Sequence, residues 1–180
     1  MQHLVVGFAG LSRSGKTFLS TTISGLLGWP RASFGDQVRK VATARGVDTD
    51  LEQLLEIGDG LVTNDCEQFC RDVLGAIKWD KDKSVILDGV RHSVVVDTVQ
   101  GLISPQSFRL VFVETPFETR DRRFREKFVS SGITLSGLDH SIDRDAGKLR
   151  LMADLIVDGN PGAATKALQG LLKSIQEWGN

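Results

Sequence analysis

Apolar positions along the chain cluster in short runs, separated by longer segments that mix hydrophobic and polar residues. Within each run several consecutive residues are apolar, which is typical of strands buried on both faces of a parallel sheet. The mixed segments contain the start and stop signals of helices. The runs predict strands at residues 3–9, about 31–34, 84–88, 108–114 and 154–158.

Helix signals fill the segments between the predicted strands. Residues 17–28 follow a helical pattern that ends at Gly28, and Pro30 just beyond cannot continue a helix. Asp50 and Gln53 have the spacing of a capping box, which predicts a helix start there. Further helix starts are predicted at Asn64 with Glu67, at Thr115, Pro116 and Glu118, and at Asn160 and Pro161, where a last helix covers roughly 161–177.

The alternation of strands and helices predicts the fold class. It favours an α/β protein with three layers and a mainly five-stranded parallel sheet, because parallel strands need crossover connections. A length of 180 residues suits one domain, or one core with inserted flaps. Such sheets bind ligands beyond the carboxyl ends of their strands, so functional residues are expected there.

The octapeptide GLSRSGKT, residues 10–17, directly follows the first predicted strand. Its glycines let the backbone curl so that N–H groups point inward, and the following helix adds the positive end of its dipole. In this P-loop pattern the lysine reaches the outer phosphates of a nucleotide and the threonine offers a hydroxyl to Mg²⁺, which predicts binding of Mg-ATP. The predicted phosphate-binding residues are Gly10, Ser12, Arg13, Ser14, Gly15, Lys16 and Thr17.

Two further motifs follow the second and third predicted strands, namely SFGDQVR at 33–39 and DGVR at 88–91. With the P-loop, they resemble the motifs of the nucleoside monophosphate kinase group, an adenylate-kinase-like family of P-loop proteins that includes phage deoxynucleotide kinases. Adenylate kinases carry GDMLR and DGFPR at these places, so DGVR is one residue shorter and lacks the proline. The resemblance spans roughly residues 3–158 and implies the P-loop NTPase fold with helical insertions.

The resemblance also implies an activity. It is phosphoryl transfer from Mg-ATP to a small phosphorylated acceptor, most simply a nucleoside or deoxynucleoside monophosphate. Arg39 and Arg91 follow strand ends and can each bind an acceptor phosphate through two hydrogen bonds. Asp88 is placed to hold a water molecule on Mg²⁺, beside Thr17, and Asp36 either caps a helix or also contacts the acceptor. The predicted acceptor-binding residues are Asp36, Arg39, Arg91 and Arg144.

The segment TRDRRFREK, residues 119–127, contains five basic residues and two acidic ones. This excess of positive charge favours a lid that carries arginines and closes on the triphosphate. The alternative is a merely solvated helix face, which usually balances its charges. By the resemblance, Arg120 stacks on the ATP base and the next arginines face the phosphates. Residues 130–137 are predicted to form the lid tip. The predicted catalytic residues are Lys16, Arg91, Arg123 and Arg125.

These assignments divide a single domain, residues 1–180, into three parts. No motif lies in residues 47–80, where an acceptor base would be recognised, so the acceptor stays open. His92 is expected to be a capping or surface residue. The core comprises residues 1–35, 81–120 and 150–180, the acceptor-binding insertion about 36–80, and the lid about 121–148.

Composition and charge narrow the function classes. A net charge of −1 provides no field that attracts nucleic acid, so a polynucleotide partner is not expected. No apolar run approaches the ~20 residues of a membrane span, and the N-terminal region lacks a secretory signal, so a cytoplasmic location without membrane contact is expected. Cys66 and Cys70 share an apolar helix face and are expected to be reduced core thiols.

Two alternative functions stay open from the sequence. A regulatory or assembly protein that binds and hydrolyses ATP would need no acceptor-binding arginines. A kinase of a hydroxyl acceptor, such as dephospho-coenzyme A or the 5′ end of a nucleic acid, would need a general base, for which Asp36 and Asp88 are available. The choice between ATP and GTP and the oligomeric state are not determined by the sequence.

Overall fold

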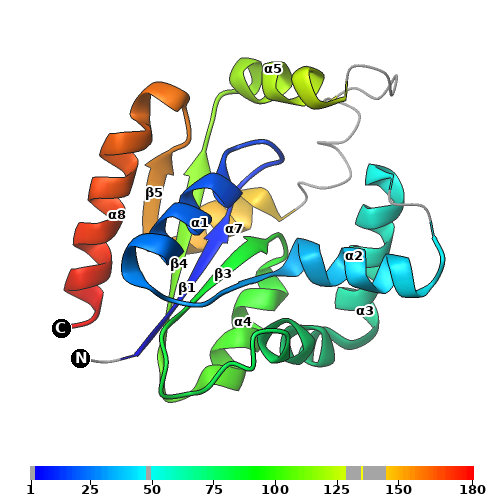
Figure 1. The fold of residues 1–180 in the computed structure, drawn as a ribbon, viewed down its shortest axis with the longest axis horizontal. Coiled ribbons are helices and arrows are strands. Elements are labelled where there is room, and N and C mark those ends of the chain that lie inside the picture. Colours follow the sequence, from blue (N-terminus) through cyan, green and yellow to red (C-terminus); the bar gives the residue numbers. More distant parts are fainter. Residues whose placement is uncertain (1–2, 48–49, 129–134, 136–144) are drawn as a thin grey trace.

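A sheet of five strands forms the middle layer of the molecule (Figure 1). The structure is a computed structural model, and it describes residues 3–47, 50–128, 135 and 145–180. All neighbouring strands are parallel, in the order β2-β3-β1-β4-β5, which confirms the predicted fold class. The strands are β1 (Leu4–Ala9), β2 (Arg31–Ser33), β3 (Val85–Val90), β4 (Ser107–Glu114) and β5 (Leu155–Asp158).

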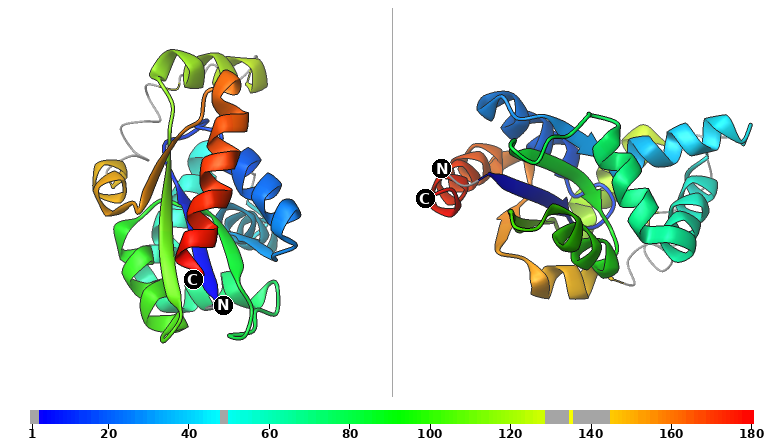
Figure 2. Two further views of the ribbon diagram at one scale, coloured as in Figure 1. Left: turned by 90° about the vertical axis from the view of Figure 1, so that its left-hand side faces the viewer. Right: turned by 90° about the horizontal axis from the view of Figure 1, so that it is seen from below.

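Helices cover both faces of the sheet (Figure 2). Helices α1 and α8 pack on one face, while α3, α4 and α7 pack on the other. Helix α5 crosses beyond the carboxyl ends of the strands, and α2 lies beside α3 at the β2 end of the sheet (Figure 1). The described helices are α1 (Lys16–Leu27), α2 (Phe34–Ala44), α3 (Leu51–Gly75), α4 (Ser93–Ile103), α5 (Phe117–Lys127), α7 (Ala146–Met152) and α8 (Ala164–Trp178), which a 3-10 helix (Pro161–Ala163) precedes.

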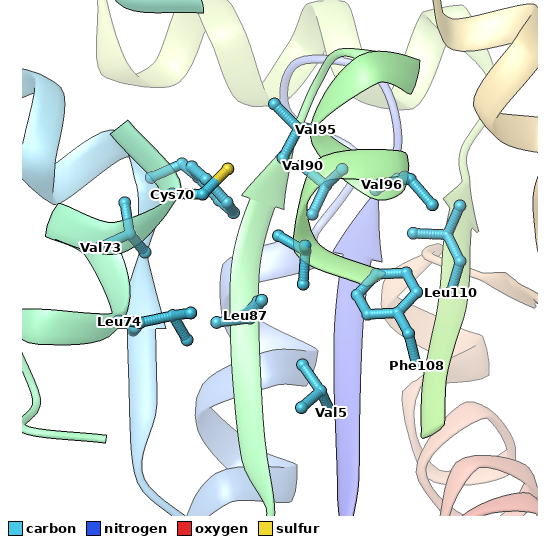
Figure 3. Packing of buried hydrophobic residues seen from close by; sticks show 14 of the residues in the cluster. Val5, Cys70, Val73, Leu74, Leu87, Val90, Val95, Val96, Phe108 and Leu110 are labelled. Atoms are coloured by element: carbon cyan, nitrogen blue, oxygen red, sulfur yellow. The ribbon is translucent and has the colours of Figure 1, made fainter. Parts of the chain in front are cut away.

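The alternation of side chains along β1 produces two cores. Val6 contributes to the core under α1 and α8, and Val5 to the core under α3, α4 and α7. In the second core, Val5 and Leu87 of the sheet face side chains of α3, among them Cys70 (Figure 3). Cys70 is a free thiol, and its burial raises the pKa of that thiol, which agrees with the predicted core role. Cys66 is half-buried.

Two local helix signals act as the sequence predicts, at the end of α1 and at the start of α3. Helix α1 ends before Gly28, whose φ of 65° lies in the left-handed region that glycine tolerates. At the start of α3, the carboxylate of Asp50 accepts a hydrogen bond of 2.8 Å from the backbone N–H of Gln53. Gly28 thus ends α1 shortly before β2, and Asp50 marks the start of α3.

The helix start predicted at Asn64 is wrong by one residue. Asp65 interrupts α3 with φ −158° and ψ 83°, and its carboxylate accepts a hydrogen bond of 2.8 Å from the N–H of Gln68. The chain thus contains two overlapping capping-box spacings, and the kinked helix uses the second. The kink sets the two halves of α3 at an angle, and both halves contribute apolar side chains to the core.

Three further helix ends differ in detail from the prediction. Ser33, not Asp36, caps α2, because the Ser33 hydroxyl accepts a hydrogen bond of 3.2 Å from the N–H of Asp36. Thr115 does not cap α5, since its hydroxyl donates to the carbonyl of Ser14 at 2.8 Å. Pro161 opens a 3-10 turn, so α8 itself starts at Ala164. No helix in the described part of the chain is long and apolar enough to cross a membrane.

Candidate active site

The loop between β1 and α1 depends on two glycines. Gly10 has φ 140°, and a β-carbon there would lie 2.4 Å from the carbonyl oxygen of Val113. Gly15 has φ 101° and occupies the position just before α1. Both positions exclude ordinary side chains, so the chain can wrap around the amino end of α1. The result is a loop whose open side faces a helix dipole, as an anion-binding site requires.

Lys16 projects into this loop. It is largely buried, and its ammonium group donates hydrogen bonds of 2.7 Å to the carbonyl oxygens of Gly10 and Leu11. The ammonium charge is therefore held at the mouth of the loop, within reach of a bound phosphate. When a phosphate binds, the Lys16 ammonium would donate to a phosphate oxygen in place of these neutral carbonyl oxygens. The anionic acceptor forms the stronger hydrogen bond.

Two other strands hold the loop in place from the far side. The Thr115 hydroxyl, at the end of β4, donates to the carbonyl of Ser14. Gly159, just after β5, approaches so closely that a β-carbon would lie 2.1 Å from the same carbonyl oxygen. The sequence analysis missed Gly159; its signal was a glycine directly after an apolar strand.

The residues predicted for the metal lie together. The Thr17 hydroxyl donates to the carboxylate of Asp88 at 2.9 Å, and Asp88 is buried. The second carboxylate oxygen of Asp88, Oδ1, is buried and has no hydrogen-bond partner among the described residues. A hydroxyl beside an unsatisfied carboxylate oxygen fits Mg²⁺, which prefers oxygen ligands and keeps several waters.

A cation that the sequence analysis missed also contacts this carboxylate. The guanidinium of Arg31, at the start of β2, forms an ion pair with Asp88 Oδ2 and donates a hydrogen bond of 3.1 Å to the hydroxyl of Ser20. Arg31 therefore orients Asp88 and balances its charge. The signal was a lone arginine at the start of a predicted apolar strand, which sequence periodicity alone cannot distinguish from a surface residue.

A bulge at the end of β3 directs the next arginine. Phe8 of β1 pairs with Asp88, but Ala9 pairs with Val90, so Gly89 is the extra residue. Its φ of 86° is accessible to glycine at little cost. Arg91 follows this bulge. A single cleft brings together residues predicted for the donor and for the acceptor, namely Ser12, Arg13, Gly15, Lys16, Thr17, Asp36, Arg39, Asp88, Arg91 and Arg123.

Beside Arg39 and Arg91, the cleft continues into a mainly apolar pocket between α2, α3 and the start of α4. At its polar edge the carboxylate of Asp59 lies 2.9 Å from Nε2 of His92, which joins α3 to the segment after β3. His92 sits at the N-cap position of α4, but its side chain forms no cap hydrogen bond. The apolar walls consist of Phe34, Val38, Leu51, Leu54, Leu55, Val62, Phe69 and Val95, and Arg39 and Arg91 also line the pocket.

Two arginines of α5, Arg120 and Arg123, contact the phosphate loop. Arg120 is buried and donates a hydrogen bond of 3.2 Å to the carbonyl of Ser12. Arg123 donates to the carbonyls of Arg13 at 3.0 Å and Gly159 at 2.8 Å. Both therefore anchor α5 to the phosphate loop.

Arg125 and Arg144 are the other two arginines that the sequence predicts for the site. Arg125 is largely exposed, pairs with Asp121 at 2.8 Å, and does not line the cleft. Arg144, like the predicted lid tip apart from Leu135, lies outside the described residues. The charge excess of residues 119–127 did not distinguish Arg123 from Arg125, because the packing of α5 on the phosphate loop decides which face of the helix points inward.

A second hollow lies beside the phosphate loop, between the start of α5 and the loop after β5. The Arg120 guanidinium lies 5.7 Å from the ring centre of Phe117 there, and Phe117 is partly exposed. Asn160, which lines the hollow, accepts a hydrogen bond of 3.0 Å at its side-chain oxygen from the hydroxyl of Thr119. Leu11, Pro116, Phe117, Arg120, Asp158 and Asn160 are among its lining residues.

Several solved structures share the whole fold. The gluconokinase of Sinorhizobium meliloti 1021 has a TM-score of 0.60 at 14% identity, over 99% of this chain and 93% of that chain. The shikimate kinase of Acinetobacter baumannii, in complex with shikimate, has a TM-score of 0.61 at 17% identity, over 96% and 93%. The APS kinase of Mycobacterium tuberculosis, in complex with AMPPNP and APS, has 0.61 at 17%, over 97% and 98%. The chain thus has the fold of small P-loop kinases, as its motifs predict, while neither a family model nor a curated protein matches it.

Proposed function

We propose that the protein transfers the γ-phosphoryl group of Mg-ATP to the phosphate of a nucleoside or deoxynucleoside monophosphate. The observation that supports this most strongly is the composition of one cleft. It joins a phosphate loop at one end to two arginines and an apolar pocket at the other. A kinase of a phosphorylated heterocycle needs these three parts in this order.

The donor nucleotide binds at the loop. Lys16 and the backbone N–H groups around it hold the phosphates, and the base lies in the hollow beside Phe117 and Arg120. Thr17 and Asp88 would hold Mg²⁺, Asp88 through a water molecule. The metal ion, when bound, neutralises charge that develops on the phosphate oxygens.

The acceptor lies against α2 and α3, which belong to the proposed acceptor-binding insertion. Its phosphate binds Arg39 and Arg91, and its base enters the apolar pocket. A flat heterocycle gains free energy by leaving water for walls of Leu, Val and Phe. A polyol such as a sugar acid would instead lose hydrogen bonds to water at hydroxyl groups that these walls cannot replace. Asp59, oriented by His92, offers an acceptor for an N–H group on the base.

Transfer to a phosphate needs no general base, because the acceptor oxygen is already ionised. Catalysis then consists of alignment and of positive charge around the moving phosphoryl group. Of the two carboxylates available as a base for a hydroxyl acceptor, Asp36 pairs with an arginine, and Asp88 is bound through its Oδ2 while its Oδ1 is assigned to Mg²⁺ through water in this proposal. Asp36 is exposed and pairs with Arg39 at 2.6 Å, while Asp88 binds Thr17 and Arg31. These contacts favour a phosphate acceptor over a hydroxyl acceptor.

A coupled assay of ADP release tests the proposal. The purified chain is given Mg-ATP with each common NMP and dNMP, and separately with dephospho-coenzyme A, gluconate and shikimate. We expect at least one monophosphate to raise ADP release well above the rate without acceptor, and the alcohols to have no effect. As a control, Arg71→Gln removes an arginine that is exposed on α3 and paired with Glu67, so its rates should equal those of the wild type. Stimulation by an alcohol alone would overturn the nucleotide assignment, and hydrolysis unaffected by every acceptor would favour the regulatory ATPase.

A further inference from the structure

A closed ring of hydrogen bonds joins α1, β2 and β3 beside the phosphate loop. The Arg31 side chain, from β2, pairs with Asp88 Oδ2 and donates from Nε to the Ser20 hydroxyl at 3.1 Å. The Ser20 hydroxyl donates to the carbonyl of Thr17 at 3.2 Å, and the Thr17 hydroxyl donates to Asp88 Oδ2 at 2.9 Å. Each member of the ring orients the next, so the Asp88 carboxylate is held in one position.

The ring lies mostly in the interior of the protein. Ser20 is fully buried, and the Asp88 side chain is only 5% exposed, whereas that of Arg31 is 20% exposed. Because little water reaches these groups, the ion pair between Arg31 and Asp88 is only weakly screened. The positive charge of Arg31 therefore compensates the negative charge of Asp88 before any ligand binds.

The two carboxylate oxygens of Asp88 have different partners. Oδ2 accepts hydrogen bonds from both Thr17 and Arg31, whereas Oδ1 is buried and has no hydrogen-bond partner among the described residues. A carboxylate whose charge is already compensated attracts a divalent cation less strongly. Oδ1 can still accept a hydrogen bond from a water molecule. The arrangement thus suits a carboxylate that contacts a metal ion through water and not directly.

The rest of the cleft also offers little to a cation that arrives alone. Among the described residues that line the cleft, seven side chains are basic and three are acidic. One of the acidic residues, Asp36, pairs with Arg39 at 2.6 Å, so its charge is compensated like that of Asp88. The phosphates of a nucleotide would supply the negative charge that the cleft lacks.

We propose that Arg31 is a positioning residue that makes metal binding depend on the nucleotide. By compensating Asp88, Arg31 prevents this carboxylate from binding a free divalent cation, so that Mg²⁺ is held only together with the phosphates of the donor. Arg31 acts through Asp88. The inference rests on the proposed function, because it concerns the same metal site, but it does not depend on the identity of the acceptor.

Binding of Mn²⁺ without nucleotide tests this inference. Mn²⁺ takes the same oxygen ligands as Mg²⁺, and electron paramagnetic resonance measures the ion that stays free. We expect the wild type to bind Mn²⁺ with AMPPNP and not without it. Arg31→Gln should bind Mn²⁺ without nucleotide, roughly 10-fold or more tightly than the wild type, because the charge of Asp88 is no longer compensated. Equal Mn²⁺ affinities of the two proteins without nucleotide would overturn the inference.

Three further variants identify the group responsible. Arg31→Lys keeps the positive charge and should behave as the wild type, and combining Arg31→Gln with Asp88→Asn should abolish the nucleotide-free binding. Arg109→Gln is the matched control, because it removes the arginine of another ion pair at the sheet, formed with Asp154 at 3.4 Å, and it should not bind Mn²⁺. Nucleotide-free binding that survives Asp88→Asn, or that also occurs in Arg109→Gln, would contradict the role of Arg31.

Thermal unfolding provides a second measurement on the same variants. Arg31→Gln leaves a buried carboxylate with fewer partners, so its unfolding temperature should fall. Mg²⁺ alone should raise that temperature again, whereas it should leave the wild type unchanged, because only a bound ligand stabilises the folded state. Arg31→Met, which keeps the length of the side chain, takes the place of Arg31→Gln if the latter does not fold. A variant that Mg²⁺ does not stabilise would count against the inference.

The wild type with AMPPNP distinguishes failure of this inference from failure of the proposed function. If the wild type binds neither AMPPNP nor Mn²⁺ in its presence, the proposed function is wrong and the inference falls with it. If the wild type binds both, while Arg31→Gln shows the metal binding of the wild type, only the role of Arg31 is disproved.

Discussion

The proposed donor end and the proposed acceptor end of the cleft, called the donor end and the acceptor end below, are built in different ways. At the donor end, residues 10–17 form one continuous loop, and much of what faces a phosphate is backbone shaped by Gly10 and Gly15. At the acceptor end, Arg39 comes from α2, Asp59 from α3 and Arg91 from the segment after β3. The donor end is thus a local structure, whereas the acceptor end exists only when three distant segments pack together.

This difference explains why the two ends carry different kinds of information. A backbone loop around a helix end recognises any phosphate chain, so it specifies a class of donor. Side chains from separate helices recognise one shape and one set of polar groups, so they specify the acceptor. The same sheet could therefore support different acceptors through changes in α2, α3 and the segment after β3.

The largest effect is expected at the donor end. Lys16→Ala should lower kcat/KM by about 1,000-fold or more and abolish measurable AMPPNP binding, because a buried ammonium that meets the outer phosphates is lost. The unfolding temperature should stay within a few degrees, since the loop is shaped by glycines. Lys173→Ala, on the exposed face of α8, is the matched control and should change neither quantity. Normal turnover by Lys16→Ala would refute the phosphate-loop assignment.

At the acceptor end, arginine variants should separate acceptor use from donor binding. Arg91→Ala should cost on the order of 2–4 kcal/mol of transition-state stabilisation, while AMPPNP affinity barely changes. Arg39→Ala should cost less, because the Arg39 side chain is 58% exposed and already pairs with Asp36. Steady-state kinetics with the best acceptor, beside AMPPNP calorimetry, measure both quantities. If these variants lose AMPPNP affinity as strongly as they lose activity with the acceptor, donor binding and acceptor binding are not independent.

A smaller effect is expected from the backbone that directs Arg91. Gly89→Ala should lower the free energy of unfolding by about 1–2 kcal/mol, because alanine is strained at φ 86°. It should also raise the KM of the acceptor more than that of ATP. Gly101→Ala, in the last turn of α4 where an added β-carbon would meet open space, should instead stabilise the protein slightly. Urea unfolding of the two variants tests the contrast.

The smallest effect concerns Asp145, which links the segment before α7 to the start of α4. Its carboxylate accepts hydrogen bonds of 2.8 Å and 2.9 Å from the N–H and hydroxyl of Ser93. The backbone hydrogen bond from Ser93 is the main cause that lowers the pKa of Asp145, with Lys148 a further cause. Because the folded pKa is lowered, the stabilisation is complete above the ordinary carboxyl pKa of about 3.9 and is lost as the pH falls through the lowered value.

Asp145→Asn should therefore destabilise the protein at pH 7 by up to about 1 kcal/mol, since solvent weakens these contacts. The difference between variant and wild type should shrink steadily below pH 4. Urea midpoints measured from pH 7 down to pH 3 give the profile. If the difference in stability does not depend on pH, the shape of the Asp145 side chain, and not its charge, accounts for the stabilisation.

Local signals explain most of what the sequence predicted correctly. The end of α1 at Gly28 and the cap at Asp50 depend on backbone conformation and on residues three positions apart. The error at Asn64 arises from two capping patterns one residue apart, Asn64 with Glu67 and Asp65 with Gln68. Each pattern satisfies the same local rule, and the packing of α3 selects the second.

The sequence by itself determined the fold class and the phosphate loop, because consecutive apolar residues and left-handed glycines act within a few residues. The tertiary structure decided which polar groups meet. The ion pair of Arg31 with Asp88 joins residues 57 positions apart, and the contact of Asp59 with His92 spans 33. Such pairs depend on strand order and on helix packing, which the spacing of residues along the chain does not encode.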